Sequence, residues 1–99
     1  MKSNKKKAVE KSEIRILLVD DHPIVRQGMK MILLQEPDMM VCGEAESASD
    51  ALKIIPEVRP QVAIVDLALK QSSGLELIKD LQIRHPEILV LVLSMRDET

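Results

Sequence analysis

Two kinds of segment alternate along the chain when its apolar and polar positions are followed in order. Four short apolar runs have the length and the β-branched content of strands, and they lie at residues 13–19, 39–46, 61–66 and 88–93. Three segments between them place apolar residues at helical spacing, and they cover about residues 24–35, 48–55 and 74–84. The alternation β-α-β-α-β-α-β predicts an α/β fold with a parallel sheet and right-handed connections.

Aspartate residues follow the ends of two of the predicted strands. The run from Val62 to Val65 has no polar face, which is typical of a strand covered on both sides, and Asp66 follows it directly. The first run ends in the pair Asp20 and Asp21. Because the carboxyl ends of parallel strands meet at one edge of the sheet, we expect these three carboxylates to converge there.

The first predicted helix carries several local signals. Pro23 suits the first turn, and we expect an acidic residue ahead of it to act as the cap. Gly28 is expected to allow a close approach to the sheet, and His22 is interpreted as a turn residue near the site. The apolar stripe of this helix consists of Val25, Met29, Ile32 and Leu33. In the second helix, Pro56 and Pro60 are expected to bracket the exit, and the strand at 39–46 is expected near an edge of the sheet.

Composition narrows the class of protein. The 99 residues are 45% apolar and 30% charged, which fits one globular domain. No apolar run approaches the roughly 18 residues of a membrane span, and the start of the chain lacks the apolar centre of a signal peptide. A single cysteine, Cys42, excludes an internal disulfide and fits a reducing compartment. These features predict a cytoplasmic protein with no membrane contact.

Charge is uneven along the chain. The first 11 residues hold five lysines and one glutamate, although the whole chain has a formal net charge of −2. We interpret residues 1–12 as a disordered basic tail and residues 13–99 as an acidic folded domain. An acidic body without aromatic residues argues against nucleic-acid binding by the folded part.

The converging carboxylates have a specific chemistry. Mg²⁺ prefers oxygen ligands and relieves the repulsion between neighbouring carboxylates. A carboxylate can also attack phosphorus to form an acyl phosphate, while a bound metal neutralises charge on the transferring group. The alternative is that these aspartates only cap strands and form turns. The combination of Asp20-Asp21, Asp66 and a serine after the fourth strand, Ser94, favours a functional site.

These residues resemble a known family. The tracts Leu17–His22, Ala63–Leu67 with Gly74 eight residues after Asp66, and Val92–Met95 are similar to those of bacterial response regulator receiver domains. Ser73–Ile78 and Ser94–Glu98 look most like the branch whose receivers precede a helix-turn-helix DNA-binding domain. The resemblance implies a flavodoxin-like sheet with helices on both faces. It also implies the order 2-1-3-4 for the four predicted strands.

The resemblance also implies roles for individual residues. Asp66 would accept a phosphoryl group from a sensor histidine kinase. Asp20, Asp21, Asp66 and the backbone carbonyl of Ala68 would hold Mg²⁺. Ser94 would turn its hydroxyl to the aspartyl phosphate and switch its loop to control transcription. Such a domain is a phosphoacceptor and not an enzyme with a substrate of its own.

The family pattern continues beyond this sequence. It includes a fourth helix, a fifth strand ending near an essential lysine, and a fifth helix; the last lysine here, Lys79, matches none of these features. We therefore expect a C-terminally truncated receiver, with DNA contact only through a missing effector domain. The apolar strand Ile88–Leu93 would form an open sheet edge and is expected to promote self-association.

Three other functions can be weighed against the receiver. A phosphohydrolase with an aspartate nucleophile usually needs two carboxylates two residues apart, but Asp20 and Asp21 are adjacent. A nucleotide-binding ATPase needs a glycine-rich phosphate loop, and the three glycines are not arranged as one. The remaining alternative is a truncated interaction module of the same fold that is not phosphorylated.

Overall fold

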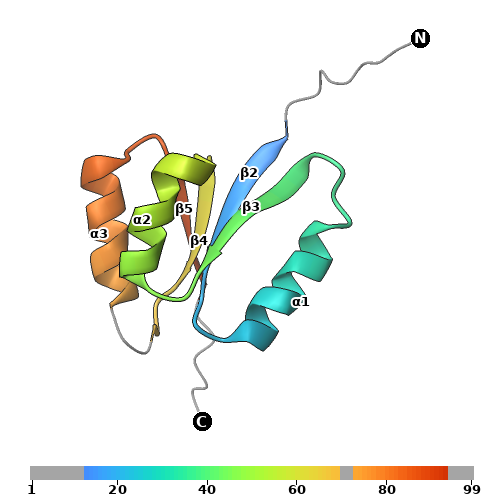
Figure 1. Ribbon diagram of the computed structural model, residues 1–99, viewed down its shortest axis with the longest axis horizontal. Coiled ribbons are helices and arrows are strands. Elements are labelled where there is room, and N and C mark those ends of the chain that lie inside the picture. The colour runs from blue at the N-terminus through green and yellow to red at the C-terminus, as the bar shows by residue number, and fades with distance from the viewer. Residues whose placement is uncertain (1–12, 70–72, 94–99) are drawn as a thin grey trace.

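The computed structural model describes residues 13–69 and 73–93, and its elements follow the predicted alternation (Figure 1). The strands are β2 (Ile14–Val19), β3 (Met39–Ala45), β4 (Val62–Asp66) and β5 (Leu89–Leu93). The helices are α1 (Pro23–Leu33), α2 (Ala48–Val58) and α3 (Gly74–Arg84). Apart from the end of α2, these bounds lie within two residues of the predicted ones. The predicted tail and Ser94 fall outside the described residues.

The four strands form one parallel sheet in the order β3-β2-β4-β5, which confirms the expected order 2-1-3-4. Strands β2 and β4 lie inside the sheet, while β3 lies at an edge as predicted. Val19 pairs with Val65 in the register of these two central strands. The residues that follow them, Asp20 and Asp66, therefore lie side by side at the carboxyl edge.

The main core lies between the sheet and the helices α2 and α3. These two helices cover one face, and α1 lies on the other face (Figure 1). Alternate residues of the central strands point toward α2 and α3, as the two-residue period of a strand requires. The core on this face contains Leu17, Val19, Ala45, Ala51, Ile55, Ala63, Val65, Leu69, Leu77, Leu81 and Ile88.

The face under α1 is only partly covered. Helix α1 packs mainly against β3 and contains no fully buried residue, and Ile32 is 65% exposed. The predicted apolar stripe is therefore wrong at Ile32. The expected role of Gly28 is also wrong, because a β-carbon there would meet no atom within 4 Å. At the other end of this face, Leu89 and Leu91 of β5 are 59% and 48% exposed.

The ends of the helices explain where the chain turns. Ser47 and Ser73 precede α2 and α3, and each hydroxyl accepts the backbone N–H three residues later. The predicted exit between Pro56 and Pro60 is confirmed, because α2 continues through Pro56 and ends at Val58. An interior proline removes one intrahelical hydrogen bond and its ring crowds the carbonyl four residues earlier, which fits the end of the helix two residues after Pro56. The guanidinium of Arg15 from β2 donates to the carbonyl of Val58 at 2.6 Å. This carbonyl at the C-terminus of α2 has no partner within the helix, and Arg15 supplies one.

The helices of the described residues contain 11 residues each, and none is long and apolar enough to cross a membrane.

Candidate functional site

Three aspartates meet at the carboxyl edge of the sheet, as the sequence predicts. Asp20 and Asp21 follow β2, and Asp66 is the last residue of β4. Ligand atoms from these three residues and from His22 all lie within 4.8 Å of one another. Asp20 and Asp66 are buried, with 2% and 4% exposure, although an aspartate is normally a surface residue. This burial sets the cluster apart from an ordinary strand-end turn.

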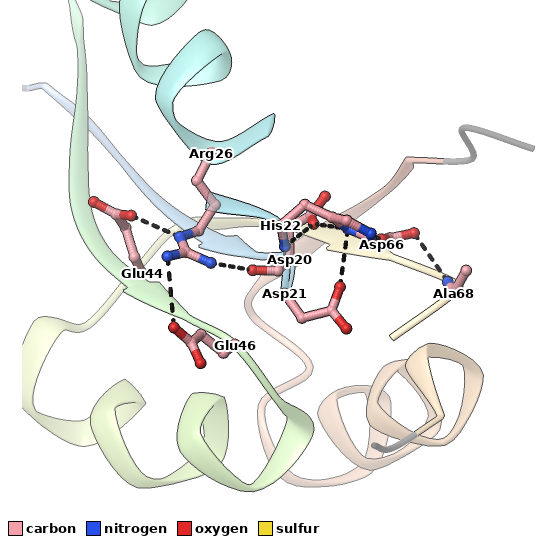
Figure 2. A network of polar contacts seen from close by, with 8 residues as sticks. All are labelled: Asp20, Asp21, His22, Arg26, Glu44, Glu46, Asp66 and Ala68. Carbon is pink, nitrogen blue, oxygen red and sulfur yellow. Dashed lines mark hydrogen bonds and ion pairs between the residues drawn. The ribbon is translucent and has the colours of Figure 1, made fainter. Parts of the chain in front are cut away.

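The ring of His22 lies within the carboxylate cluster (Figure 2). Its Nδ1 is 2.9 Å from Oδ1 of Asp20, 2.9 Å from Oδ1 of Asp21 and 3.9 Å from Oδ2 of Asp66. The backbone N–H of His22 also donates to Oδ1 of Asp20 at 2.8 Å. His22 occupies the N-cap position of α1, so the expected acidic cap is wrong. The residue does turn the chain beside the site as predicted, but its imidazole is part of the cluster.

Asp66 is held by the loop that follows it. The backbone N–H of Ala68 donates to Oδ1 of Asp66 at 2.9 Å and fixes the orientation of the carboxylate (Figure 2). The predicted contribution of Ala68 was its carbonyl as a metal ligand, and this role stays a prediction. The neighbouring Leu67 donates its N–H to the carbonyl of Leu93 at 3.3 Å, which joins this loop to the end of β5.

Arg26 connects the site to the edge strand β3. Its guanidinium donates to the backbone carbonyl of Asp20 at 2.6 Å and to Oε1 of Glu44 at 2.9 Å, and it lies 3.7 Å from Glu46 (Figure 2). Lys30 donates to the other oxygen of Glu44 at 2.7 Å. These hydrogen bonds, first that of Lys30 and then that of Arg26, lower the pKa of Glu44, and its partial burial opposes them. This network is not predictable from the sequence pattern, because Arg26 and Glu44 are 18 residues apart.

The carboxylate cluster fits a bound cation. Oδ2 of Asp20 is buried and has no hydrogen-bond partner among the described residues. The nearby Arg26 contacts the backbone of Asp20 and so does not supply its carboxylate with a partner. Buried negative charge at this density is costly unless a positive charge compensates for it. An oxygen-rich donor set of this kind suits Mg²⁺ or a similar divalent ion.

The predicted switch residue Ser94 lies outside the described residues, so its role stays a prediction. Its chain neighbour Leu93 is described, and it pairs with Asp66 in the register of β4 and β5. The fourth strand therefore ends beside the central carboxylate, as the sequence predicts.

Comparison with known families gives one match over most of the chain. The profile of the response regulator receiver domain matches residues 16–99. Among curated relatives, the DNA-binding transcriptional activator DevR/DosR of Mycobacterium tuberculosis is 40% identical over 81 residues, covering 82% of this chain. The transcriptional regulatory protein DegU of Brevibacillus brevis is 34% identical over 90 residues, covering 91% of it. The chain spans 37% and 38% of the length of these two relatives.

Solved structures match both the fold and the sequence. The isolated receiver domain of RcsB from Salmonella enterica serovar Typhimurium, determined with the phosphomimetic BeF3−, superposes with a TM-score of 0.80 at 30% identity. The match covers 88% of this chain and 65% of that one. A two-component response regulator of the LuxR family from Aurantimonas sp. SI85-9A1 gives a TM-score of 0.79 at 32% identity, covering 87% and 61% of the two chains.

Proposed function

The chain belongs to the response regulator receiver domain family, and we propose that it accepts a phosphoryl group on Asp66. The observation that carries the proposal is the placement of this carboxylate. Asp66 is buried beside Asp20 at the carboxyl edge, and the N–H of Ala68 fixes its orientation. A held carboxylate next to a cation site is the arrangement that acyl phosphate formation needs.

In the proposed reaction, a carboxylate oxygen of Asp66 attacks the phosphorus of a phosphohistidine on a sensor kinase. The new bond joins this oxygen to phosphorus, and the bond between phosphorus and the histidine nitrogen breaks. Asp20, Asp21, Asp66 and the carbonyl of Ala68 would hold Mg²⁺, which when bound neutralises charge on the phosphoryl oxygens. The backbone N–H of Ala68 orients the carboxylate. The chain thus acts as a phosphoacceptor and not as an enzyme on a separate substrate.

We further propose that the side chain of Ser94 responds to phosphorylation of Asp66. Leu67 and Leu93 are joined by a backbone hydrogen bond, so the loop after Asp66 is coupled to the end of β5. A hydroxyl on the next residue could donate to a phosphoryl oxygen and carry its own loop along. In a full-length cytoplasmic regulator, this movement would control transcription through a separate effector domain that contacts DNA. The curated relatives are transcriptional regulators, which supports this assignment.

Incubation with Mg²⁺ and acetyl phosphate, followed by intact-mass measurement, tests the proposal. We expect the gain of one phosphoryl group that hydroxylamine removes, because hydroxylamine cleaves acyl phosphates and leaves serine phosphates intact. The gain should be absent from Asp66→Asn and from a sample treated with EDTA. A folded protein that gains no phosphoryl group would instead be the interaction module considered above. Labelling of Asp66→Asn to the same extent would place the acceptor elsewhere.

Self-association through β5 is the second proposed property. Within the described sheet, β5 pairs with β4 on one side only, and its sequence is entirely leucine and valine. Leu89, Leu91 and Val92 are about half exposed or more. An apolar strand with an open edge is a template for pairing with another chain. We therefore propose that two copies join through this strand.

A further inference from the structure

His22 is placed unlike the other helix-capping residues. Ser47 and Ser73 turn their side chains to the helices they precede, and each accepts a backbone N–H. His22 has the same extended backbone at the N-cap of α1, but its side chain makes no capping hydrogen bond. The ring instead points away from α1 and lies over the three carboxylates (Figure 2).

The ring nitrogen lies at hydrogen-bond distance from two carboxylates, and the same spacing fits a ligand set. Nδ1 of His22 lies 2.9 Å from one oxygen of Asp20 and 2.9 Å from one oxygen of Asp21. Adjacent ligands on an octahedral ion with bonds of about 2.1 Å are separated by about 3.0 Å. The hydrogen bond from the backbone of His22 to Asp20 fixes this turn, so the ring is already positioned before a cation arrives.

An independent observation favours a cation among these groups. The side chain of Asp20 is 3% exposed, and its Oδ2 has no hydrogen-bond partner in the described part of the chain. A buried carboxylate oxygen without a partner is costly unless a ligand supplies one. The cation that satisfies Asp20 would lie within reach of the ring nitrogen of His22.

We infer that His22 is a fourth side-chain ligand, which makes this a mixed oxygen and nitrogen site that takes imidazole-binding first-row transition ions as well as Mg²⁺. Imidazole is a poor partner for Mg²⁺ but a good one for Co²⁺, Ni²⁺ and Zn²⁺. Nδ1 would carry the lone pair and Nε2 the proton. The inference rests on the cation site of the proposed function and does not depend on phosphoryl transfer to Asp66.

Calorimetric titration of the untagged full chain with Co²⁺ or Mg²⁺ at one fixed pH tests the inference. We expect His22→Ala to weaken Co²⁺ binding by about tenfold or more, since even the loss of an outer-shell partner costs about 10 to 100-fold. Mg²⁺ binding should stay unchanged. His22→Gln, which keeps a side-chain hydrogen-bond donor and guards against loss of the fold, should weaken Co²⁺ binding like alanine. His85→Ala is the matched control, because His85 caps the far end of α3.

Proton NMR of the Co²⁺-loaded protein gives a second readout. A ring N–H signal shifted by the paramagnetic ion should be present in the wild type and in His85→Ala, and absent from His22→Ala. Unchanged Co²⁺ affinity in His22→Ala would overturn the inference. Tighter binding of both ions in His22→Ala would also overturn it, since the ring would then compete with the cation for its place. If Co²⁺ binding depends on His22 but Asp66 is not phosphorylated, the proposed phosphoryl transfer is refuted and the inference about His22 stands.

Discussion

Gly74, the first residue of α3, lies against the backbone carbonyl oxygen of Asp66 with no room between them for a β-carbon. A β-carbon on residue 74 would overlap that oxygen and would lie 2.7 Å from Cα of Leu67. The start of α3 thus forms one wall of the loop that leaves the site. The glycine is required for space, because no glycine in the described chain has a positive φ.

We expect Gly74→Ala to destabilise the fold by about 1–3 kcal/mol, the usual cost of forcing a methyl group into a packed position. The clash is with backbone atoms, so no side chain can rotate to relieve it. Urea unfolding followed by circular dichroism measures the change. The same variant should bind Mg²⁺ more weakly, because the displaced loop carries Asp66 and Ala68.

Gly28→Ala is the matched control. Gly28 lies within α1, and a β-carbon there would meet no atom within 4 Å. Alanine is a better helix former than glycine, so this variant should stabilise the protein by about 0.5–1 kcal/mol. Similar destabilisation in both variants would show that the tight contact with Asp66 is not the reason why residue 74 must be glycine.

Glu44 makes stability depend on pH in a defined direction. Hydrogen bonds from Lys30 and Arg26 lower the pKa of Glu44 in the folded state below its ordinary value of 4.5. A depressed carboxyl pKa stabilises the fold fully above the unfolded-state value, and this stabilisation is lost as the pH falls through the folded-state pKa. The contribution should be under about 1 kcal/mol, because the pair is partly exposed to solvent.

Wild type should therefore be more stable than Glu44→Gln at neutral pH, and the difference should vanish as the pH falls through the lowered folded-state pKa of Glu44. Unfolding free energies of the two proteins across this range provide the measurement. Glu57→Gln removes the same charge from an exposed position on α2 and serves as the control. A difference that grows on acidification would contradict the assigned network.

Repulsion among the site carboxylates predicts that Asp66→Asn is more stable than wild type in EDTA. The ligand atoms of the cluster lie within 4.8 Å of one another, and two of its three aspartates are buried. Removal of one charge should stabilise the fold by roughly 1–3 kcal/mol at the effective dielectric constants of proteins. Addition of Mg²⁺ should raise the melting temperature of wild type and leave that of Asp66→Asn nearly unchanged.

Asp50→Asn is expected to change folding stability in the opposite direction, so it controls for the effect of removing a negative charge. Asp50 lies in the first turn of α2, where a negative charge favours the helix dipole. Neutralising it should destabilise the protein by about 0.3–1 kcal/mol. A loss of stability in Asp66→Asn would contradict this prediction, because it would show that the Asp66 carboxylate stabilises the fold.

Sequence reasoning predicted the backbone of the site better than its side chains. The convergence of Asp20 and Asp66 follows from two apolar runs and a parallel topology, because strand order alone brings their ends together. The ring of His22 could not be placed in this way. Its position depends on a side-chain rotamer and on whether an N-cap residue bonds its helix, and the sequence does not determine either.

Packing across elements was the other source of error. Gly28 resembles a close-approach glycine because it lies in an amphipathic helix, but α1 leaves open space at this position. In the sequence, Gly74 stands out only through its match to the family motif, and the structure supplies the physical reason: a β-carbon there would overlap the carbonyl oxygen of Asp66. In each case the deciding factor is what lies opposite the residue in space.

The edge of β5 that is unpaired in the described sheet predicts a dimer that a single charge should dissociate. Leu91 lies at the centre of the strand and is 48% exposed. In an antiparallel pair of β5 strands around a two-fold axis, this residue would meet its own counterpart, so Leu91→Lys would place two like charges together. Sedimentation velocity should show a dimer for wild type and a monomer for this variant. Ile83→Lys is the control: Ile83 is 78% exposed on α3, away from the edge, and its variant should remain a dimer. A wild-type monomer at high concentration, or a dimer that survives Leu91→Lys, would exclude association through β5.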